Sequence, residues 1–216
     1  MLQLSTLESS ALELLKKLQK SPLLGGARLV GGTALALQIG HRKSIDLDFF
    51  GELNFEIQEL IDEIKEFAEL TILSESKNIH IYSVNGIKVD FVNYKYPWLD
   101  DAVVEDGITL ASIRDIAAMK ISAIIGRGTK KDFIDVAFLL QRFSLEEILD
   151  FYSMKYKDGS VFMVLKSLTY FDDAEDDIMP DMLIKKSWKQ VKKEILAEAG
   201  KFNLNAKKNI KGKNLQ

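Results

Sequence analysis

The stretch from Leu29 to Gly51 restricts the possible folds more than any other part of the chain. It reads Leu-Val-Gly-Gly-Thr-Ala-Leu-Ala-Leu-Gln-Ile-Gly-His-Arg-Lys-Ser-Ile-Asp-Leu-Asp-Phe-Phe-Gly. The pattern predicts a short strand, a glycine turn, a helix over residues 33–39 that ends at Gly40, and a second strand over residues 43–50.

Two carboxylates, Asp46 and Asp48, occupy the second predicted strand. Residues i and i+2 of a strand point to the same face, so these two share a face with their Cα atoms roughly 6–7 Å apart. Carboxylates this close repel each other unless a positive charge lies between them, and a divalent cation such as Mg²⁺ is the usual solution. The alternative is a solvated pair at a strand end. If the strand begins early, Arg42 and Ser44 share that face, and Arg42 is either a phosphate ligand or a solvated loop residue.

The glycines upstream favour the metal interpretation. Val30-Gly31-Gly32 follows a predicted strand and opens a helix at Thr33. Glycine permits a tight turn and a close approach of the backbone to a ligand. The exposed N–H groups of a helix N-terminus suit a phosphate. A phosphate cradle beside paired carboxylates indicates metal-assisted phosphoryl or nucleotidyl chemistry.

A β-hairpin is predicted where Asn85-Gly86 separates two apolar runs. In its second arm, over residues 87–94, Lys88 and Asp90 point to the same face. Asp90 is either a third carboxylate of the site or a polar residue of an exposed hairpin.

The motif spacing resembles the signature of the polymerase-β-type nucleotidyltransferase superfamily: Val-Gly-Gly, thirteen residues, then Asp-Leu-Asp-Phe. The fuller strings Gly-Gly-Thr-Ala-Leu-Ala-Leu and His-Arg-x-Ser-x-Asp-Leu-Asp-Phe-Phe resemble one branch, the AbiEii/AbiGii toxin family of bacterial toxin–antitoxin and abortive-infection systems. The resemblance covers the N-terminal half and continues into the middle of the chain. It implies an α+β nucleotidyltransferase fold, with a mixed sheet, flanking helices and a helical C-terminal region.

The same resemblance implies a reaction: transfer of a nucleoside monophosphate from an NTP to an acceptor hydroxyl, with release of pyrophosphate. Two Mg²⁺ ions would bridge the triphosphate and the three carboxylates. The residues expected to bind metal are Asp46, Asp48 and Asp90, and those expected to contact the nucleotide in this half are Gly31, Gly32, Thr33, Arg42 and Ser44. Asp90, or Asp135 as an alternative, would deprotonate or orient the acceptor hydroxyl.

A lysine interrupts an apolar stripe in the second half of the chain. Lys120 lies in the middle of the apolar face of a helix predicted over residues 112–125. A lysine there either snorkels to solvent or meets a negative group, and both a triphosphate and a carboxylate would serve.

The next predicted helix, over residues 130–142, carries Asp132 and Asp135 on its flank. Together with Lys120, the run Arg127…Lys131-Asp132-x-x-Asp135 resembles the later motifs of the family, in which a lysine and an aspartate join the active site. The resemblance thus implies catalytic roles for Lys120 and Asp135 and nucleotide contacts for Arg127 and Lys131. Without it, Lys131 and Asp132 would be ordinary surface charges.

The chain is expected to divide into a nucleotidyltransferase core over residues 1–110, a helical region over 111–200 that completes the cleft, and a basic tail over 201–216. The tail contains five lysines and no acidic residue. Two interpretations stay open for it, disorder and contact with RNA phosphate. The acidic run over residues 172–177 is interpreted as a solvated loop.

Composition excludes several classes of protein. The 216 residues carry a net charge of -3, so no global positive field commits the chain to nucleic acid. There is no cysteine, which rules out a disulfide framework and fits a cytoplasmic location. No apolar run reaches the length that spans a membrane, and the N-terminus does not read as a signal peptide.

The acceptor is left open by the residues. The resemblance suggests an RNA end such as that of tRNA, and a cognate antitoxin as partner. A small-molecule acceptor, as for antibiotic nucleotidyltransferases, keeps the chemistry and changes the substrate. A non-catalytic module that sequesters a partner belongs to another class, and the complete set of three carboxylates argues against it.

Overall fold

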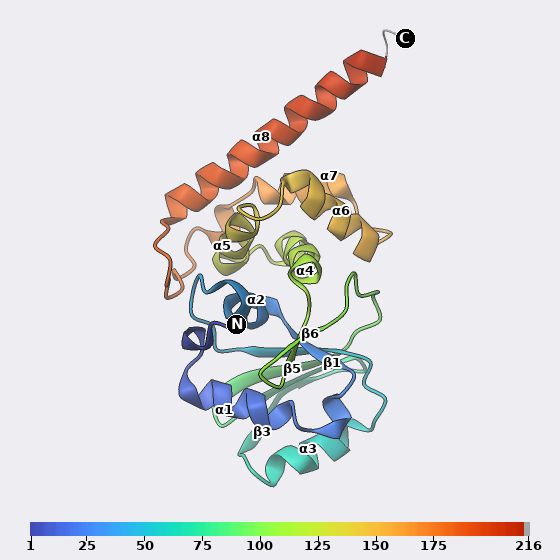
Figure 1. Cartoon of the computed structure of the whole chain (residues 1–216), viewed down its shortest axis with the longest axis vertical. Coiled ribbons are helices and arrows are strands. Elements are labelled where there is room, and N and C mark those ends of the chain that lie inside the picture. The colour runs from blue at the N-terminus through green and yellow to red at the C-terminus, as the bar shows by residue number, and fades with distance from the viewer. Residues whose placement is uncertain (214–216) are drawn as a thin grey trace. The chain divides into compact units, whose positions relative to one another are not determined.

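The computed structural model describes residues 1–213, and the side chains of residues 1–204 (Figure 1). It divides the chain into two compact units. Unit 1 contains Met1–Ile116 together with Asp181–Ile184, and unit 2 contains Ala117–Pro180 and the chain from Lys185 onward. The boundary lies within helix α4 (Ile113–Gly126), a few residues after the boundary predicted from the sequence.

Unit 1 is built on a seven-stranded mixed sheet with the strand order β3-β4-β5-β2-β1-β7-β6. The strands are β1 (Ala27–Val30), β2 (Leu47–Gly51), β3 (Leu70–Glu75), β4 (Ile79–Val84), β5 (Ile87–Asn93), β6 (Val103–Glu105) and β7 (Ile108–Leu110). The central strand β2 pairs antiparallel with β1 and parallel with β5. This sheet, with its flanking helices, confirms the predicted α+β fold.

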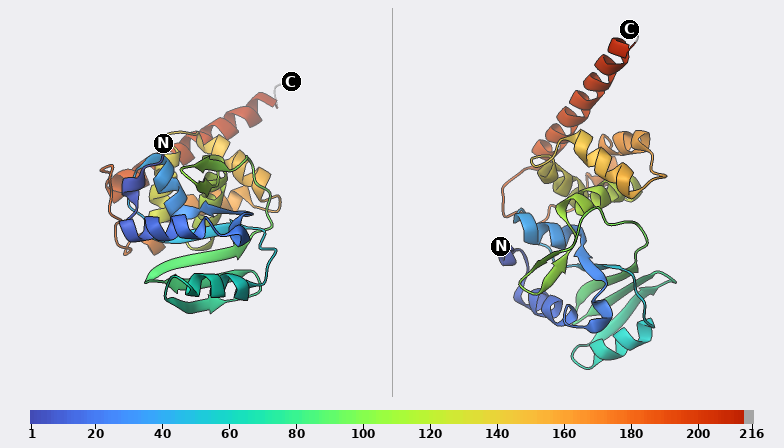
Figure 2. Two further views of the ribbon diagram at one scale, coloured as in Figure 1. Left: turned by 60° about the horizontal axis from the view of Figure 1, so that its bottom comes forward. Right: turned by 45° about the vertical axis from the view of Figure 1, so that its right-hand side comes forward.

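The two faces of the central strands differ in burial. Leu47, Phe49, Val89 and Phe91 are fully buried, and the rings of Phe49 and Phe91 stack with centroids 5.5 Å apart. Helices α1 (Ser9–Leu18) and α3 (Ile57–Lys65) run along one side of the sheet (Figure 2). Asp48 and Asp90, which alternate with these apolar residues, are only half-buried. The pleat therefore presents the carboxylates on the more accessible face.

The second strand begins later than the sequence predicts. β2 starts at Leu47, so Asp46 precedes the strand, and residues 42–46 do not alternate as strand residues. Arg42 instead forms an isolated antiparallel bridge with Met182. Helix α2 (Gly31–Ile39) also begins at the glycines rather than at Thr33, and it ends as predicted at Gly40, whose φ is +69°.

Helix α3 leads into β3, the edge strand of the sheet. It begins at Ile57 after Glu56 and ends at Lys65, five residues before β3 begins at Leu70. Its buried residues are Leu60, Ile61 and Ile64, a spacing that places them on one face of the helix.

The predicted hairpin is confirmed. Asn85 and Gly86 have φ values of +50° and +79°, as a two-residue turn between β4 and β5 requires. A second hairpin joins β6 and β7 through Asp106 and Gly107, with φ values of +54° and +75°. Its Asp-Gly pair is also a sequence signal for a hairpin turn. The flanking strands have only three residues each, which is too few to show an alternating apolar pattern in the sequence.

Unit 2 is helical. It comprises most of α4, α5 (Lys130–Leu139), α6 (Leu145–Lys155), α7 (Val161–Leu168), a short 3-10 turn (Asp172–Ala174) and α8 (Trp188–Lys213). A capping box begins α6, with Ser144 and Glu147 exchanging hydrogen bonds. Helix α8 contacts α5, α6 and α7. It continues to Lys213, into the stretch predicted as a basic tail, and residues 214–216 of that tail lie outside the described residues.

Within the part of the chain that the structure describes, no helix is both long and apolar enough to cross a bilayer. The longest helix, α8, is rich in lysine.

Gly51 lies close to the backbone of the neighbouring strand β1, where Ala27 is its partner, and this gives a stability prediction. A Cβ atom there would lie 2.3 Å from the carbonyl oxygen of Gly26 and 2.6 Å from the Cα of Ala27. Because backbone atoms cannot move aside as a side chain can, we expect Gly51→Ala to lower the free energy of unfolding by about 2–3 kcal/mol, measured by urea denaturation. Gly126→Ala is the control, since a Cβ there meets nothing within 4 Å. Equal effects of the two changes would contradict the prediction.

Candidate active site

The two glycines at the start of α2 each face a charged side chain. A Cβ on Gly31 would lie 2.2 Å from Oδ2 of Asp48, and a Cβ on Gly32 would lie 2.2 Å from Nη2 of Arg42. Gly31 also has a φ of +70°, a conformation that other residues rarely adopt. The backbone conformation of Gly31 thus favours glycine, and a side chain at Gly32 would displace the Arg42 guanidinium. An acidic and a basic group converge on the N-terminus of one helix.

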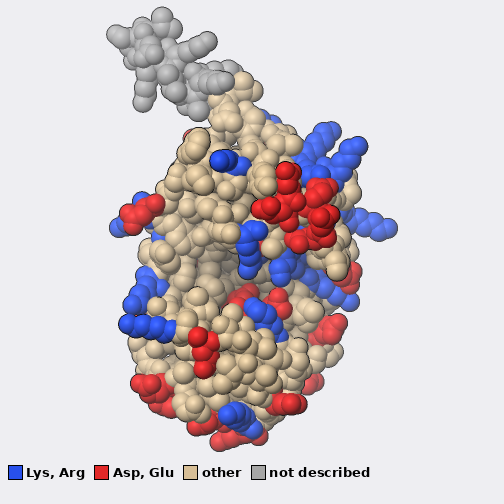
Figure 3. Space-filling view, turned by 180° about the vertical axis from the view of Figure 1, so that it is seen from behind, with Lys and Arg blue, Asp and Glu red and all other residues tan. Residues whose placement is uncertain are grey.

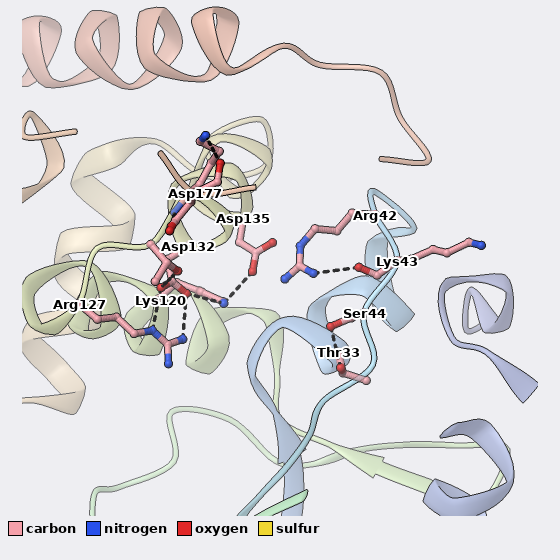
Figure 4. Close-up of polar contacts among 11 residues, drawn as sticks. Thr33, Arg42, Lys43, Ser44, Lys120, Arg127, Asp132, Asp135 and Asp177 are labelled. Carbon is pink, nitrogen blue, oxygen red and sulfur yellow. Dashed lines mark hydrogen bonds and ion pairs between the residues drawn. The ribbon is translucent and has the colours of Figure 1, made fainter. Parts of the chain in front are cut away.

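Thr33 organises the loop that leads to the carboxylates. Its hydroxyl donates to the carbonyl oxygen of Asp46 and lies 2.8 Å from the hydroxyl of Ser44 (Figure 4). The Thr33 residue is only 1% exposed. Thr33 therefore positions the loop together with Ser44, which is half-buried. The predicted contact of Thr33 with a nucleotide stays a prediction.

Arg42 is held by the backbone of a distant segment. Its side chain is buried, and Nη1 donates to the carbonyl oxygen of Lys43 at 3.0 Å. The carbonyl of His41 accepts hydrogen bonds from the N–H groups of Leu183 and Ile184, both at 3.0 Å. The N–H of Lys43 donates to the carbonyl of Asp181 at 2.8 Å. The Asp181–Ile184 segment thus fixes the loop that carries Arg42, a contribution that sequence reasoning missed.

The third predicted carboxylate is paired with a neighbour on its own strand. The parallel register of β2 and β5 places Asp48 opposite Asp90. The ammonium of Lys88 lies 2.6 Å from Oδ1 and 2.7 Å from Oδ2 of Asp90. The side chain of Asp90 is 16% exposed and that of Lys88 is 42% exposed. Asp90 therefore lies on the expected face, but its charge is already compensated.

Among the residues that the structure describes, no three side chains of His, Cys, Asp or Glu are grouped so that they could hold a metal ion. The roles of Asp46, Asp48 and Asp90 in binding a metal stay a prediction. Asp46 and Asp48 still offer oxygen donors, and Asp48 lies over Gly31, where the missing side chain leaves room. Carboxylate oxygens are the ligands that Mg²⁺ prefers, so these two residues fit one hard divalent cation.

In unit 2, Lys120 meets carboxylates. Its ammonium lies 3.0 Å from Oδ1 of Asp132 and 2.7 Å from Oδ2 of Asp135 (Figure 4). The lysine side chain is 5% exposed and both aspartates are fully buried. Of the alternatives that the sequence left open for Lys120, snorkelling is therefore excluded. Its proposed contact with a triphosphate stays a prediction, as does the catalytic role of Asp135.

Asp132 is the centre of a buried polar cluster, not the surface charge that the residues alone suggested. Arg127 donates to it through Nε at 2.9 Å and Nη2 at 3.2 Å, and the hydroxyl of Thr129 donates at 2.6 Å. Burial raises the pKa of Asp132, but the charges of Lys120 and Arg127 and the hydrogen bonds from Arg127 and Thr129 outweigh burial, so its pKa lies below the usual range. Arg127 is committed to this cluster, whereas Lys131 is exposed.

The acidic run over residues 172–177 is more than a solvated loop. A carboxylate oxygen of Asp177 accepts a hydrogen bond from the N–H of Lys130 at 2.8 Å, at the start of α5. The ammonium of Lys130 donates to the carbonyl oxygens of Glu175, at 3.0 Å, and of Asp177. The end of the run therefore caps α5.

Comparisons with known proteins agree with this architecture. A family model described as "Nucleotidyl transferase AbiEii toxin, Type IV TA system" matches residues 13–106 and 97–203. A protein of Aquifex aeolicus strain VF5, described as uncharacterized protein aq_aa25, is 36% identical over 185 residues, which cover 83% of this chain and 89% of that protein.

Solved structures share the fold at low sequence identity. The crystal structure of JHP933 from Helicobacter pylori is 20% identical with a TM-score of 0.60, and the similarity covers 97% of this chain and 98% of that one. MenT4, a nucleotidyltransferase toxin from Mycobacterium tuberculosis H37Rv, is 17% identical with a TM-score of 0.53, covering 84% and 79%.

Proposed function

Because the chain belongs to the AbiEii nucleotidyltransferase toxin family and shares its enzyme class, we propose that it transfers a nucleoside monophosphate from an NTP to a hydroxyl at an RNA end, releasing pyrophosphate. The observation that carries the proposal is the placement of the Asp48 carboxylate and the Arg42 guanidinium over adjacent glycines. In this arrangement Asp48 would bind a metal and Arg42 would bind a phosphate, side by side at a helix N-terminus.

The residues of unit 1 divide into metal-binding and phosphate-binding groups. Asp46 and Asp48 would hold Mg²⁺, which when bound neutralises negative charge on the triphosphate. Backbone N–H groups at Gly31 and Gly32 would donate to phosphate oxygens, where the dipole of α2 also favours negative charge. Arg42, fixed over Gly32 by the loop, would neutralise a second phosphate oxygen.

The chemical step forms one P–O bond and breaks another. The acceptor oxygen attacks the α-phosphorus, and the bond from that phosphorus to the pyrophosphate oxygen breaks. The hydroxyl proton passes to a carboxylate, for which Asp90 is our candidate because it lies beside Asp48 on the same face. Most of the rate enhancement would come from positioning and charge stabilisation, as is general for phosphoryl chemistry.

An RNA acceptor, such as a tRNA end, is proposed from the toxin description of the family, since modification of an essential RNA end would block translation. On the face drawn in Figure 3, acidic and basic side chains are interspersed. Contact with RNA would then be local, made by a few lysines and arginines rather than by one broad basic field. A cognate antitoxin is proposed on the same family description.

The test is incubation of the purified protein with each labelled NTP, Mg²⁺ and total RNA. We expect label in the RNA fraction for at least one nucleotide, with stoichiometric release of pyrophosphate. Pyrophosphate release that requires a small-molecule extract instead of RNA would favour the antibiotic-type acceptor. Absence of pyrophosphate release with any acceptor would contradict nucleotidyl transfer.

Gly31→Ala tests the glycine cradle. The new Cβ would strain the backbone, whose φ is +70°, and would displace the Asp48 carboxylate. Since a displacement of about 1 Å at a reacting centre can reduce the rate about 10²-fold, we expect a loss of that order in kcat/KM. Gly40→Ala is the matched control, because Gly40 has a φ of +69° and meets Gln3 rather than Asp48. Similar losses of activity in both variants would mean that backbone strain, not the position of Asp48, causes the effect.

A further inference from the structure

The face of the sheet that carries Asp48 and Asp90 continues into a group of aromatic side chains. Phe50 follows Asp48 by two residues on β2, so both side chains point to the same face. The N–H of Tyr94, the residue after β5, donates to the carbonyl oxygen of Gly51 at 2.8 Å, and the ring centroids of Phe50 and Tyr94 lie 5.2 Å apart. The aromatic group therefore begins about 7 Å from Asp48, measured along β2.

Two further rings complete the group. The rings of Tyr96 and Trp98 each have their centroid 5.3 Å from that of Tyr94. The guanidinium of Arg28 lies 4.4 Å from the centroid of the Trp98 ring, and its Nη1 donates to the carbonyl oxygen of Asp100 at 2.8 Å. The aromatic wall, as we name this group, consists of Phe50, Tyr94, Tyr96 and Trp98.

We infer that the aromatic wall binds the terminal bases of a single-stranded RNA acceptor by stacking, and so guides the RNA end to the carboxylates. This inference rests on the proposed function and names the surface through which the same site takes its acceptor. Stacking of bases on aromatic side chains is a general way to bind single strands without reading their sequence. The wall offers such a surface, because Tyr96 is 52% exposed and Trp98 is half-buried.

The loop that carries the wall is held by buried neighbours. Tyr94, whose ring contacts the three other rings of the wall, is only 8% exposed. After Trp98 the chain is fixed by Asp115, which is fully buried. The Asp115 carboxylate accepts hydrogen bonds from the N–H groups of Leu99 at 2.9 Å and Asp100 at 3.3 Å. Rings positioned in this way lose little conformational freedom when a base stacks on them, which favours binding.

The charges beside the wall favour bases over phosphates. An open hollow next to Trp98 is lined by Arg28, Asp100 and Asp101. The carboxylate of Asp100 also pairs with the guanidinium of Arg114 at 2.7 Å. With positive and negative charges balanced there, phosphates gain little by entering the hollow. The bases, which are uncharged, would therefore face the wall, and the phosphates would face solvent.

The position of the wall suits an in-line transfer. Val30 pairs with Asp48, and α2 begins directly after Val30, so the glycine cradle lies at that end of the two strands. Arg28 and Phe50, which adjoin the wall, pair further along the same strands, away from the cradle. The attacking and leaving oxygens must lie on opposite sides of the phosphorus. An acceptor that approaches from the wall would attack opposite a pyrophosphate bound at the cradle.

The experiment is a fluorescence titration of the full chain carrying Trp188→Phe, which leaves Trp98 as its one tryptophan. Phenylalanine keeps a ring at position 188, where the tryptophan contacts Phe133 and Phe171. The probe is a short single-stranded oligoadenylate, added without NTP or Mg²⁺. We expect it to change the fluorescence of Trp98, whereas an abasic oligonucleotide of the same length and charge should leave it unchanged.

Three variants in the same background isolate the stacking contact. Tyr96→Ala should weaken the affinity for oligoadenylate about tenfold, the loss expected for one base stacked on one ring. Tyr96→Phe keeps the ring and should bind as the parent does. Tyr170→Ala is the matched control, because Tyr170 is also 52% exposed but lies outside the wall. Thermal denaturation checks that each variant folds.

The outcomes separate this inference from the proposed function. In the transfer assay, Tyr96→Ala should raise KM for RNA and leave KM for the NTP unchanged. Equal affinity of Tyr96→Ala and Tyr96→Phe for oligoadenylate, or an equal response to the abasic oligonucleotide, would overturn the inference even if transfer activity is present. A response to ATP alone that Tyr96→Ala removes would assign the wall to the incoming nucleotide and would also overturn it. Binding of oligoadenylate as expected, without pyrophosphate release for any acceptor, would contradict the proposed function and leave the wall as a surface for single-stranded RNA.

Discussion

Asp48→Asn should reduce nucleotidyl transfer by about a thousandfold and leave the melting temperature unchanged or raised. The carboxylate of Asp48 lies over Gly31, where we place the metal-bound triphosphate. Loss of its charge removes a metal ligand, and it also relieves repulsion with the neighbouring carboxylates. Labelled-product assays and thermal denaturation of the same preparation measure both effects. Asp62→Asn, an exposed carboxylate on α3, is the charge-matched control.

Growth provides a second readout of the same change. Expression of the chain without its neighbouring genes should slow bacterial growth, and Asp48→Asn should restore it. Inhibition that persists in Asp48→Asn would indicate sequestration of a partner rather than catalysis. If neither form inhibits growth in several hosts, the small-molecule acceptor becomes the better hypothesis.

Local patterns predicted the centre of this fold well. The turn at Asn85-Gly86 and the end of α2 at Gly40 each depend on residues within one turn or hairpin, and the structure places both as expected. The motif from Gly31 to Asp48 also needed only the spacing along one short stretch.

Long-range backbone pairing was not predictable in the same way. The Asp181–Ile184 segment holds the Arg42 loop through N–H and C=O groups, which every residue except proline has. Such pairing imposes no residue type on either partner, so no sequence pattern reports it. The consequence was a strand predicted to start at residue 43, four residues before it does.

The burial of Asp132 and Asp135 was missed because helix α5 is buried on nearly all sides. Residues 132–139 are all buried, whereas a 3.6-residue pattern assumes one polar face. The available signal was Lys120, a charge within an apolar stripe. A buried cation requires buried anions, and the two acidic residues of the next helix were candidates for that role.

Lys120→Met should lower the free energy of unfolding by about 3–5 kcal/mol, because it leaves Asp132 and Asp135 buried without their shared cation. A snorkelling lysine would instead tolerate methionine at no loss. Urea denaturation measures the change, and Lys131→Met, an exposed lysine on the neighbouring helix, is the control. A neutral Lys120→Met would show that the cluster is not stabilising.

The pH dependence of the stability that Lys120→Met loses gives a second test of the buried cluster. The pKa of Asp132 is lowered in the folded parent, so its contribution to stability is present above the unfolded pKa of about 3.9 and is lost as the pH falls toward the folded pKa. In Lys120→Met the pKa of Asp132 should rise, because one of the charges that lowers it is gone. Protonation then removes a charge that has lost one of its partners in the variant, while it weakens the ion pair in the parent. The difference in stability between the two proteins should therefore be largest near neutral pH and shrink below about pH 4. A difference that is constant from pH 7 to pH 3 would mean that packing around the methionine, and not the buried charge, causes the loss.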